Sequence, residues 1–99
     1  MEDRRRFFRI ANDGSIAAKY ENFSLSVINI SSSGALVIKN DLHMAQTGMV
    51  DLTIDDETFV LSYEILKIDK EFMTLIFTNE DEIEKLFSVL KRLKVHHKS

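Results

Sequence analysis

The clearest fold signal in the sequence is in residues 23–38, Phe-Ser-Leu-Ser-Val-Ile-Asn-Ile-Ser-Ser-Ser-Gly-Ala-Leu-Val-Ile. In the first part, 23–27, Phe, Leu and Val alternate with serines, the pattern of a strand with one buried and one solvated face. The polar run 29–34 then interrupts the pattern with residue types that favour a tight bend. The short apolar run 34–38 predicts a well-buried strand. The stretch therefore predicts two strands joined by a serine-rich bend.

Four more segments are predicted to be strands, because their apolar residues alternate with polar ones or run together between turn residues. These segments are 16–20, 50–54, 59–68 and 72–77. About six short strands with frequent turns are typical of a small antiparallel sandwich or barrel. We therefore expect a mostly β fold, a six-stranded antiparallel β-barrel over residues 15–78, whose closure would protect the strand edges.

The last segment, residues 79–95, is predicted to be an amphipathic α-helix. Asn79 can cap its start, and Glu82 stands three residues on, as in a capping box. Its apolar residues fall on one stripe at helical spacing: Ile83, Leu86, Phe87 and Leu90. A helix this apolar needs a surface to bury against. We expect that surface to be its own barrel, with a dimer or partner interface as the alternative.

The first ten residues are predicted to be a basic arm, with four arginines: Arg4, Arg5, Arg6 and Arg9. Guanidinium groups are planar, permanently charged forks that match phosphate oxygens and the O6/N7 edge of guanine. Like charges repel, so the arm is predicted to be flexible, with Phe7 or Phe8 tethering it to the barrel. The net charge is −3 and the middle of the chain is acidic, so a local basic patch favours a small anionic ligand over a long nucleic acid.

Composition excludes several classes of protein. The 99 residues suit one domain, and 44% hydrophobic with 29% charged residues is ordinary for a globular protein. There is no cysteine, no apolar run of membrane-spanning length and no signal-peptide pattern, so we expect a cytoplasmic protein. His43, His96 and His97 lack the spacing of a metal pair, and no phosphate loop or nucleophile elbow occurs. We expect no enzyme activity, no metal and no cofactor.

Two motifs occur in order: Arg-x-x-x-Arg, with Arg5 and Arg9, and Asn-x-Ser-x-x-Gly, with Asn29, Ser31 and Gly34. Together they resemble the PilZ family of bacterial cyclic di-GMP receptors. A strand-rich middle and a closing helix are also what PilZ domains have. The resemblance therefore covers nearly all of the chain, as a single domain over residues 1–99.

The resemblance implies a role for each motif residue. Arg5 and Arg9 would contact the phosphates and the guanine edges or faces of cyclic di-GMP, while the neighbouring Arg4 and Arg6 are further candidates. Asn29 would bind a guanine edge through its amide, which donates and accepts at once. Ser31 would hydrogen-bond a base or phosphate, and Gly34 would leave room for the ligand and tolerate a strained backbone. The candidate ligand-binding residues are thus Arg4, Arg5, Arg6, Arg9, Asn29, Ser31 and Gly34.

The implied function is that of a receptor and adaptor. Cyclic di-GMP would order the N-terminal arm, and the ordered arm would signal to an unidentified effector protein that controls motility, attachment or exopolysaccharide secretion. One ligand or a stacked pair, and a monomer or a homodimer, all stay open, although Arg4 favours the stacked pair. We expect no DNA or RNA binding and no membrane insertion. The alternatives are a degenerate PilZ-like interaction module that binds no nucleotide, and a small β-barrel that binds RNA or single-stranded DNA.

Overall fold

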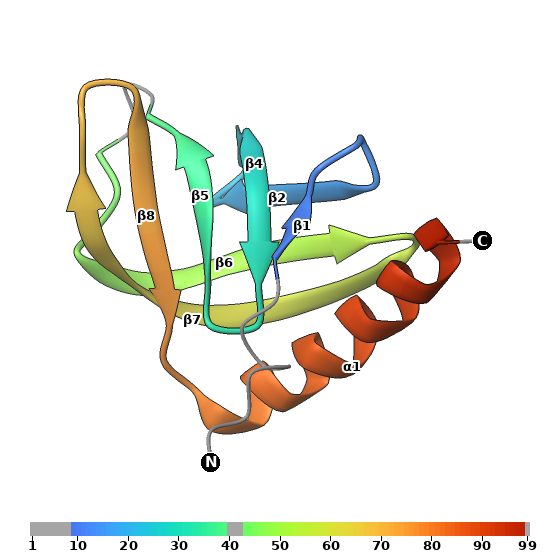
Figure 1. Cartoon of the computed structure of the whole chain (residues 1–99). Coiled ribbons are helices and arrows are strands. Elements are labelled where there is room, and N and C mark those ends of the chain that lie inside the picture. Colours follow the sequence, from blue (N-terminus) through green and yellow to red (C-terminus); the bar gives the residue numbers. More distant parts are fainter. Residues whose placement is uncertain (1–8, 40–42, 99) are drawn as a thin grey trace, which may run out of the picture.

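The computed structural model describes residues 9–39 and 43–98, which form one curled antiparallel sheet and one helix (Figure 1). The strands are β1 (Ile10–Ala11), β2 (Ile16–Tyr20), β3 (Phe23–Leu25), β4 (Val27–Ser31), β5 (Gly34–Ile38), β6 (Thr47–Ile54), β7 (Glu57–Ile68) and β8 (Phe72–Phe77). The helix, α1 (Glu80–Lys98), follows them. The flexible arm predicted at the N-terminus lies, except for Arg9 and Ile10, outside the described residues.

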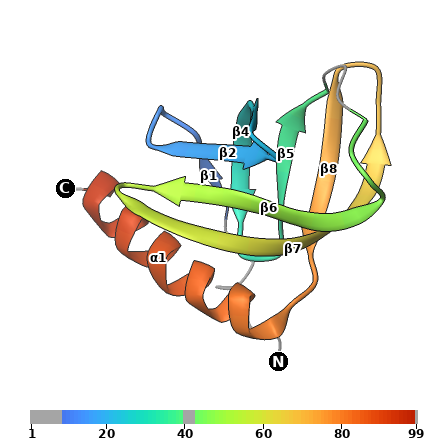
Figure 2. The ribbon, with the colours of Figure 1, turned by 180° about the vertical axis from the view of Figure 1, so that it is seen from behind.

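The strand order is β1-β4-β5-β8-β7-β6-β2-β3, and every neighbouring pair is antiparallel. The predicted class, mostly β with antiparallel strands and a C-terminal helix, is confirmed. The sheet nevertheless has eight strands instead of six, and it curls into a half-barrel with β1 and β3 at its edges (Figures 1 and 2). The expected closure of the barrel is therefore incomplete.

The two extra strands have separate causes. β1 has only two residues, which is too short for any periodicity, and it lies partly in the predicted arm. The strand predicted over 23–27 is split at Ser26, because Leu25 pairs with β2 whereas Val27 pairs with β5. The Ser26 carbonyl accepts a hydrogen bond from the Ile38 amide (2.9 Å), so the corner stays connected to the sheet.

The core lies inside the curl of the sheet, and α1 packs against it. Viewed from behind, α1 runs below β6 and β7 (Figure 2). Leu86 and Leu90 are fully buried among the strand residues, which confirms that the helix covers its own barrel. Phe87 is only half-buried, with the Lys91 amine 4.9 Å from its ring centroid. No helix within the described residues is long and apolar enough to span a membrane.

The start of α1 differs from the predicted capping box. Asn79 caps the helix as expected, since its Oδ1 accepts a hydrogen bond from the Glu82 amide (3.0 Å). The Glu82 carboxylate does not close the box, because it accepts a hydrogen bond from the backbone amide of Ser62 in β7 (2.7 Å). β8 ends at Phe77, opposite Tyr63, so β8 offers no acceptor to the Ser62 amide, and a side chain from α1 accepts its hydrogen bond instead.

Two tyrosines hold the segment before β6 against the sheet. The Tyr63 hydroxyl donates to the Ala45 carbonyl (2.8 Å), and the Tyr20 hydroxyl accepts from the Ala45 amide (3.3 Å). Their rings meet edge to face with centroids 6.1 Å apart. Burial, with a smaller contribution from Tyr20, raises the pKa of Tyr63 to about 12.

This burial predicts a loss of stability in alkali. The unfolded chain releases the Tyr63 proton near the ordinary pKa of 10, whereas the folded chain keeps it until about pH 12. The stabilisation is therefore complete below pH 10 and falls as the pH rises towards 12. Urea unfolding of wild type and Tyr63→Phe between pH 8 and pH 11.5 should show a shallower decline for the variant. Parallel declines would contradict the burial of this hydroxyl.

Candidate functional site

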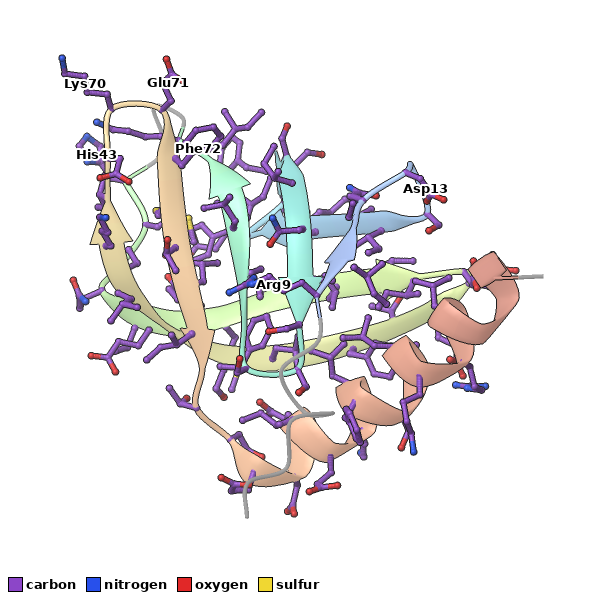
Figure 3. All side chains as sticks on the ribbon, viewed as in Figure 1. Arg9, Asp13, His43, Lys70, Glu71 and Phe72 are labelled. Carbon is purple, nitrogen blue, oxygen red and sulfur yellow. The ribbon has the colours of Figure 1, made fainter. Side chains whose placement is uncertain are left out.

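Arg9 of the first motif and Asn29 of the second lie beside each other at the paired strands β1 and β4. Ile10 is opposite Ile30 and Ala11 is opposite Asn29 in this register. Ile10 points into the core, so its neighbour Arg9 faces the outside of the sheet, beside β4 (Figure 3). Arg9 Nη1 donates a hydrogen bond to Asn29 Oδ1 (2.8 Å) across 20 positions of sequence. The other predicted arginines, Arg4, Arg5 and Arg6, lie outside the described residues.

The chemistry of this pair suits an anionic guanine nucleotide. Arg9 is exposed and uses Nη1 on Asn29, so its other N–H groups remain for a phosphate or a base. Asn29 is half-buried, and its side-chain nitrogen, Nδ2, has no hydrogen-bond partner among the described residues. The pair therefore presents several donors on one exposed face.

Two residues that the sequence analysis did not single out extend this face. Leu36 in β5 lies opposite Asn29, and Thr74 in β8 lies opposite Leu36, so the three residues form one row across neighbouring strands. Leu36 is half-buried, whereas Ala35 and Val37 on either side are in the core. The run 34–38 was predicted to be a well-buried strand; Gly34, Ala35 and Val37 are buried, whereas the outward Leu36 provides an apolar surface beside the polar pair. Only the strand order could reveal this row.

The serine-rich bend is tightly held. Ser31 is 1% exposed, and its Oγ lies 3.0 Å from Ser33 Oγ and accepts from the Ser33 amide (3.3 Å). The Ser33 carbonyl accepts a hydrogen bond from the Phe77 amide at the end of β8 (2.9 Å). The bend is thus anchored to the strand that leads into α1. The role of Ser31 in binding a ligand stays a prediction.

Gly34 has a structural requirement that its sequence context did not indicate. A Cβ at this position would lie 2.2 Å from the Leu75 carbonyl oxygen and 3.2 Å from Ile76 Cα, both backbone atoms of β8. Gly34 also has an ordinary strand conformation, since Gly14 is the only glycine with a positive φ in the described part of the chain. The expected strained backbone is therefore absent at Gly34, and close approach of β5 to β8 accounts for this glycine. Room for a ligand at this position stays a prediction.

No group of three or more His, Cys, Asp or Glu side chains in residues 9–39 and 43–98 could hold a metal ion. The face is instead built from a guanidinium, an amide and an aliphatic side chain.

Comparison with known proteins identifies the domain. The model of the PilZ domain-like family matches residues 9–98. The structure is similar to that of an uncharacterised Legionella protein, with a TM-score of 0.91 and 39% identity over 94% of this chain and 100% of the other. No curated protein matches the chain.

Two more distant structures have the same fold. The Bacillus subtilis inhibitor of motility has a TM-score of 0.63 and 18% identity over 96% of this chain and 53% of its own. The PilZ domain of CeSA from a cellulose-synthesising bacterium has a TM-score of 0.58 and 18% identity, covering 85% of this chain and 98% of the other. The family match spans nearly the whole sequence, and the Legionella structure is similar over its full length. The chain therefore belongs to the PilZ-like domain family.

Proposed function

We propose that this protein is a receptor for cyclic di-GMP that acts as an adaptor and signals to a partner protein. The observation that carries the proposal is the hydrogen bond between Arg9 and Asn29, which joins the two motifs of the family on one exposed face. PilZ-like domains are receptor or adaptor modules rather than enzymes, in agreement with this role. Motility, attachment and exopolysaccharide secretion are the processes in which such an adaptor would act.

Each residue of the face has a defined task in this proposal. The Arg9 fork would bind a phosphate oxygen or a guanine edge, where a bidentate contact contributes about 1–3 kcal/mol. The Asn29 amide would bind a second guanine edge, and Leu36 would pack against a base or ribose. The two negative charges of cyclic di-GMP would also draw in Arg4, Arg5 and Arg6. Ordering of these arginines over the sheet would then create or hide the surface that the partner recognises.

A second candidate function is a PilZ-like interaction module that binds no nucleotide. One observation favours it: Ser31 and Gly34 both have complete structural explanations in the absence of ligand. Ser31 holds the bend, and Gly34 allows β5 to approach β8. In this alternative, Ser31 and Gly34 would have a structural role and no role in ligand binding.

Isothermal titration calorimetry of the full chain with cyclic di-GMP distinguishes the two candidates. We expect saturable heat with cyclic di-GMP and none with GMP or cyclic di-AMP, and the stoichiometry will report one ligand or two per chain. A single-stranded RNA serves as a further control, because binding to it with steep salt dependence would indicate a nucleic-acid protein. No heat at roughly tens of micromolar protein would refute the receptor role.

A further inference from the structure

One edge of β7 lacks a strand partner over half of its length. β6 pairs with β7 from Glu57 to Glu64, whereas β8 pairs only with the part from Tyr63 to Ile68. Residues 57–62 therefore have a strand on one side only. Unpaired strand edges are templates for pairing with another chain.

The backbone groups on this edge can be assigned from Ser62. Its carbonyl accepts from the Thr78 amide (3.1 Å) and its amide donates to Glu82 (2.7 Å), so Ser62 faces away from β6. Alternation along an antiparallel strand then directs the N–H and C=O groups of Val60 and Thr58 to the same edge. Within the described part of the chain, these four groups have no hydrogen-bond partner.

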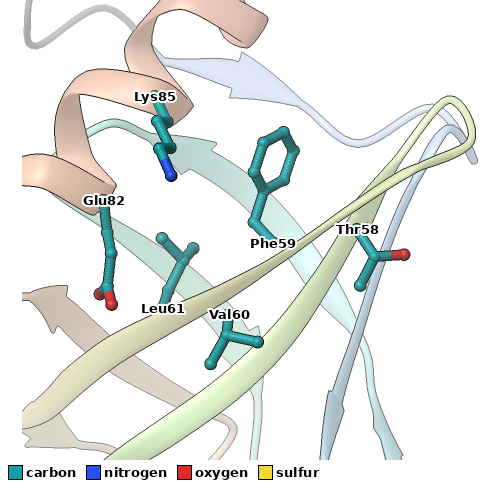
Figure 4. Close-up of a pocket in the computed structure, with 6 residues that line it drawn as sticks. All are labelled: Thr58, Phe59, Val60, Leu61, Glu82 and Lys85. Atoms are coloured by element: carbon teal, nitrogen blue, oxygen red, sulfur yellow. The ribbon is translucent and has the colours of Figure 1, made fainter.

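A groove runs along this edge between β7 and α1 (Figure 4). A pocket of about 270 Å³ is lined by Thr58, Phe59, Val60, Leu61, Glu82 and Lys85. A second pocket of about 200 Å³ lies at the β6–β7 hairpin and the later turns of α1. Val60 is 49% exposed at this edge, which is high for a valine beside a groove.

Charged side chains lie at different positions along the groove. Lys85 lines the first pocket from the helix side, with its amine directed towards β7 (Figure 4), and forms no ion pair in the described structure. Asp55 and Asp56 lie exposed at the hairpin end and likewise form none there. Glu57 already has a partner, since it binds Arg92 at 3.1 Å. The groove thus offers the positive charge of Lys85 midway and the negative charges of Asp55 and Asp56 at the hairpin end, while the Glu82 carboxylate accepts from the Ser62 amide at the other end.

We propose that this edge binds an extended segment of a partner protein as an additional strand, antiparallel to β7 and in line with β8. The segment would make four backbone hydrogen bonds, two with Val60 and two with Thr58. A β-branched apolar residue would lie beside Val60. The next residue would point towards α1, where an acidic side chain meets Lys85, and a basic residue would follow at Asp55 and Asp56.

This surface suits the adaptor role proposed above and rests on that role for its biological meaning. The binding itself needs no nucleotide, so its test can fail while cyclic di-GMP still binds, and the reverse also holds.

Amide hydrogen exchange in the full chain, followed by NMR, tests the free edge directly. Leu61 donates its N–H towards β6, whereas Val60 donates towards the groove, so the two neighbours are a matched pair. We expect the Val60 amide to exchange at least about a hundredfold faster than the Leu61 amide. Equal protection of the two amides would show that the edge is already occupied and would overturn the proposal.

The second test uses a synthetic peptide, acetyl-Thr-Val-Glu-Thr-Val-Lys-Lys-amide, and a scrambled peptide of the same composition. We expect the ordered peptide to shift the Val60 and Thr58 amide signals, and the scrambled one to bind at least about fivefold more weakly. Val60→Pro removes the edge N–H and should weaken binding about tenfold, whereas Val60→Thr keeps the N–H and should bind. Equal binding of both peptides, or none at millimolar concentration, would overturn the proposal.

A charge exchange keeps the test decisive if Val60→Pro unfolds. Lys85→Glu should weaken the ordered peptide about two- to fivefold, the range of an exposed ion pair. A peptide with lysine in place of its glutamate should bind the Lys85→Glu variant with the affinity that the ordered peptide has for wild type. It should not bind wild type that tightly. If the exchange fails, the acidic residue of the peptide does not contact Lys85, and the proposed antiparallel direction of the peptide is wrong.

Discussion

Arg9→Ala is expected to weaken cyclic di-GMP binding by roughly ten- to over a hundredfold, provided that the chain is the proposed receptor. A lost bidentate arginine contact costs about 1–3 kcal/mol, and each 1.4 kcal/mol is a factor of about ten in affinity. Arg9 is exposed, so its removal should change the free energy of unfolding by about 0.5 kcal/mol or less. Calorimetry and urea unfolding of the same variant separate the two effects.

Arg9→Lys is the matched control for the guanidinium. It keeps the positive charge but replaces the planar fork by a compact ammonium group, so we expect affinity between those of wild type and Arg9→Ala. Wild-type affinity in Arg9→Ala would place the ligand elsewhere on the molecule.

A double-mutant cycle with Asn29→Ala tests whether the two motifs act together. Because Arg9 and Asn29 are joined by a 2.8 Å hydrogen bond, their effects on binding should not add. We expect a coupling energy of about 0.5–3 kcal/mol. If the effects of Arg9→Ala and Asn29→Ala on the binding free energy simply add, the hydrogen bond between the two residues does not contribute to ligand binding.

Gly34→Ala is expected to lower the free energy of unfolding more than Arg9→Ala or Gly48→Ala. Its Cβ would lie 2.2 Å from the Leu75 carbonyl oxygen, and both atoms belong to paired strand backbones that cannot rotate away. Overpacking costs about 1–3 kcal/mol, and a clash with backbone belongs at the upper end of that range. A loss of about 3 kcal/mol would lower the midpoint of thermal unfolding by roughly 12–24 °C in a domain of this size.

Gly48→Ala provides the control within the same sheet. Its Cβ would approach the Tyr63 ring at 3.2 Å, so the ring would have to move by a few tenths of an ångström, a smaller change than separating two strand backbones. We expect a loss below about 1 kcal/mol. Equal effects of the two substitutions would show that β5 and β8 can separate, and room for a ligand would then be the better explanation of Gly34.

The local pattern of the sequence was sufficient for most elements. Alternation predicted the buried face of β6, and the break between the predicted strands 50–54 and 59–68 contains the hairpin in which Asp55 and Asp56 have φ angles of 52° and 95°. Helical spacing predicted α1 within a few residues of its observed bounds, Glu80–Lys98. These features depend on neighbours a few positions apart, which a sequence displays directly.

Features that depend on distant neighbours could not be predicted in this way. The split between β3 and β4 arises because the chain changes its pairing partner at Ser26. The Glu82 carboxylate accepts from the Ser62 amide because β8 ends before it could pair with that amide. Neither effect leaves a periodic signal in the residues concerned.

Two properties can be taken directly from the sequence: the chemistry of the candidate site, a guanidinium and an amide in two motifs 20 positions apart, and the side chains available to form a core. The fold was needed to establish that Arg9 reaches Asn29, that Leu36 lies beside them, and that half of one edge of β7 is unpaired among the described residues. The physical reason is that side-chain periodicity is local, whereas strand order and register result from hydrogen bonds and packing between segments far apart in the chain.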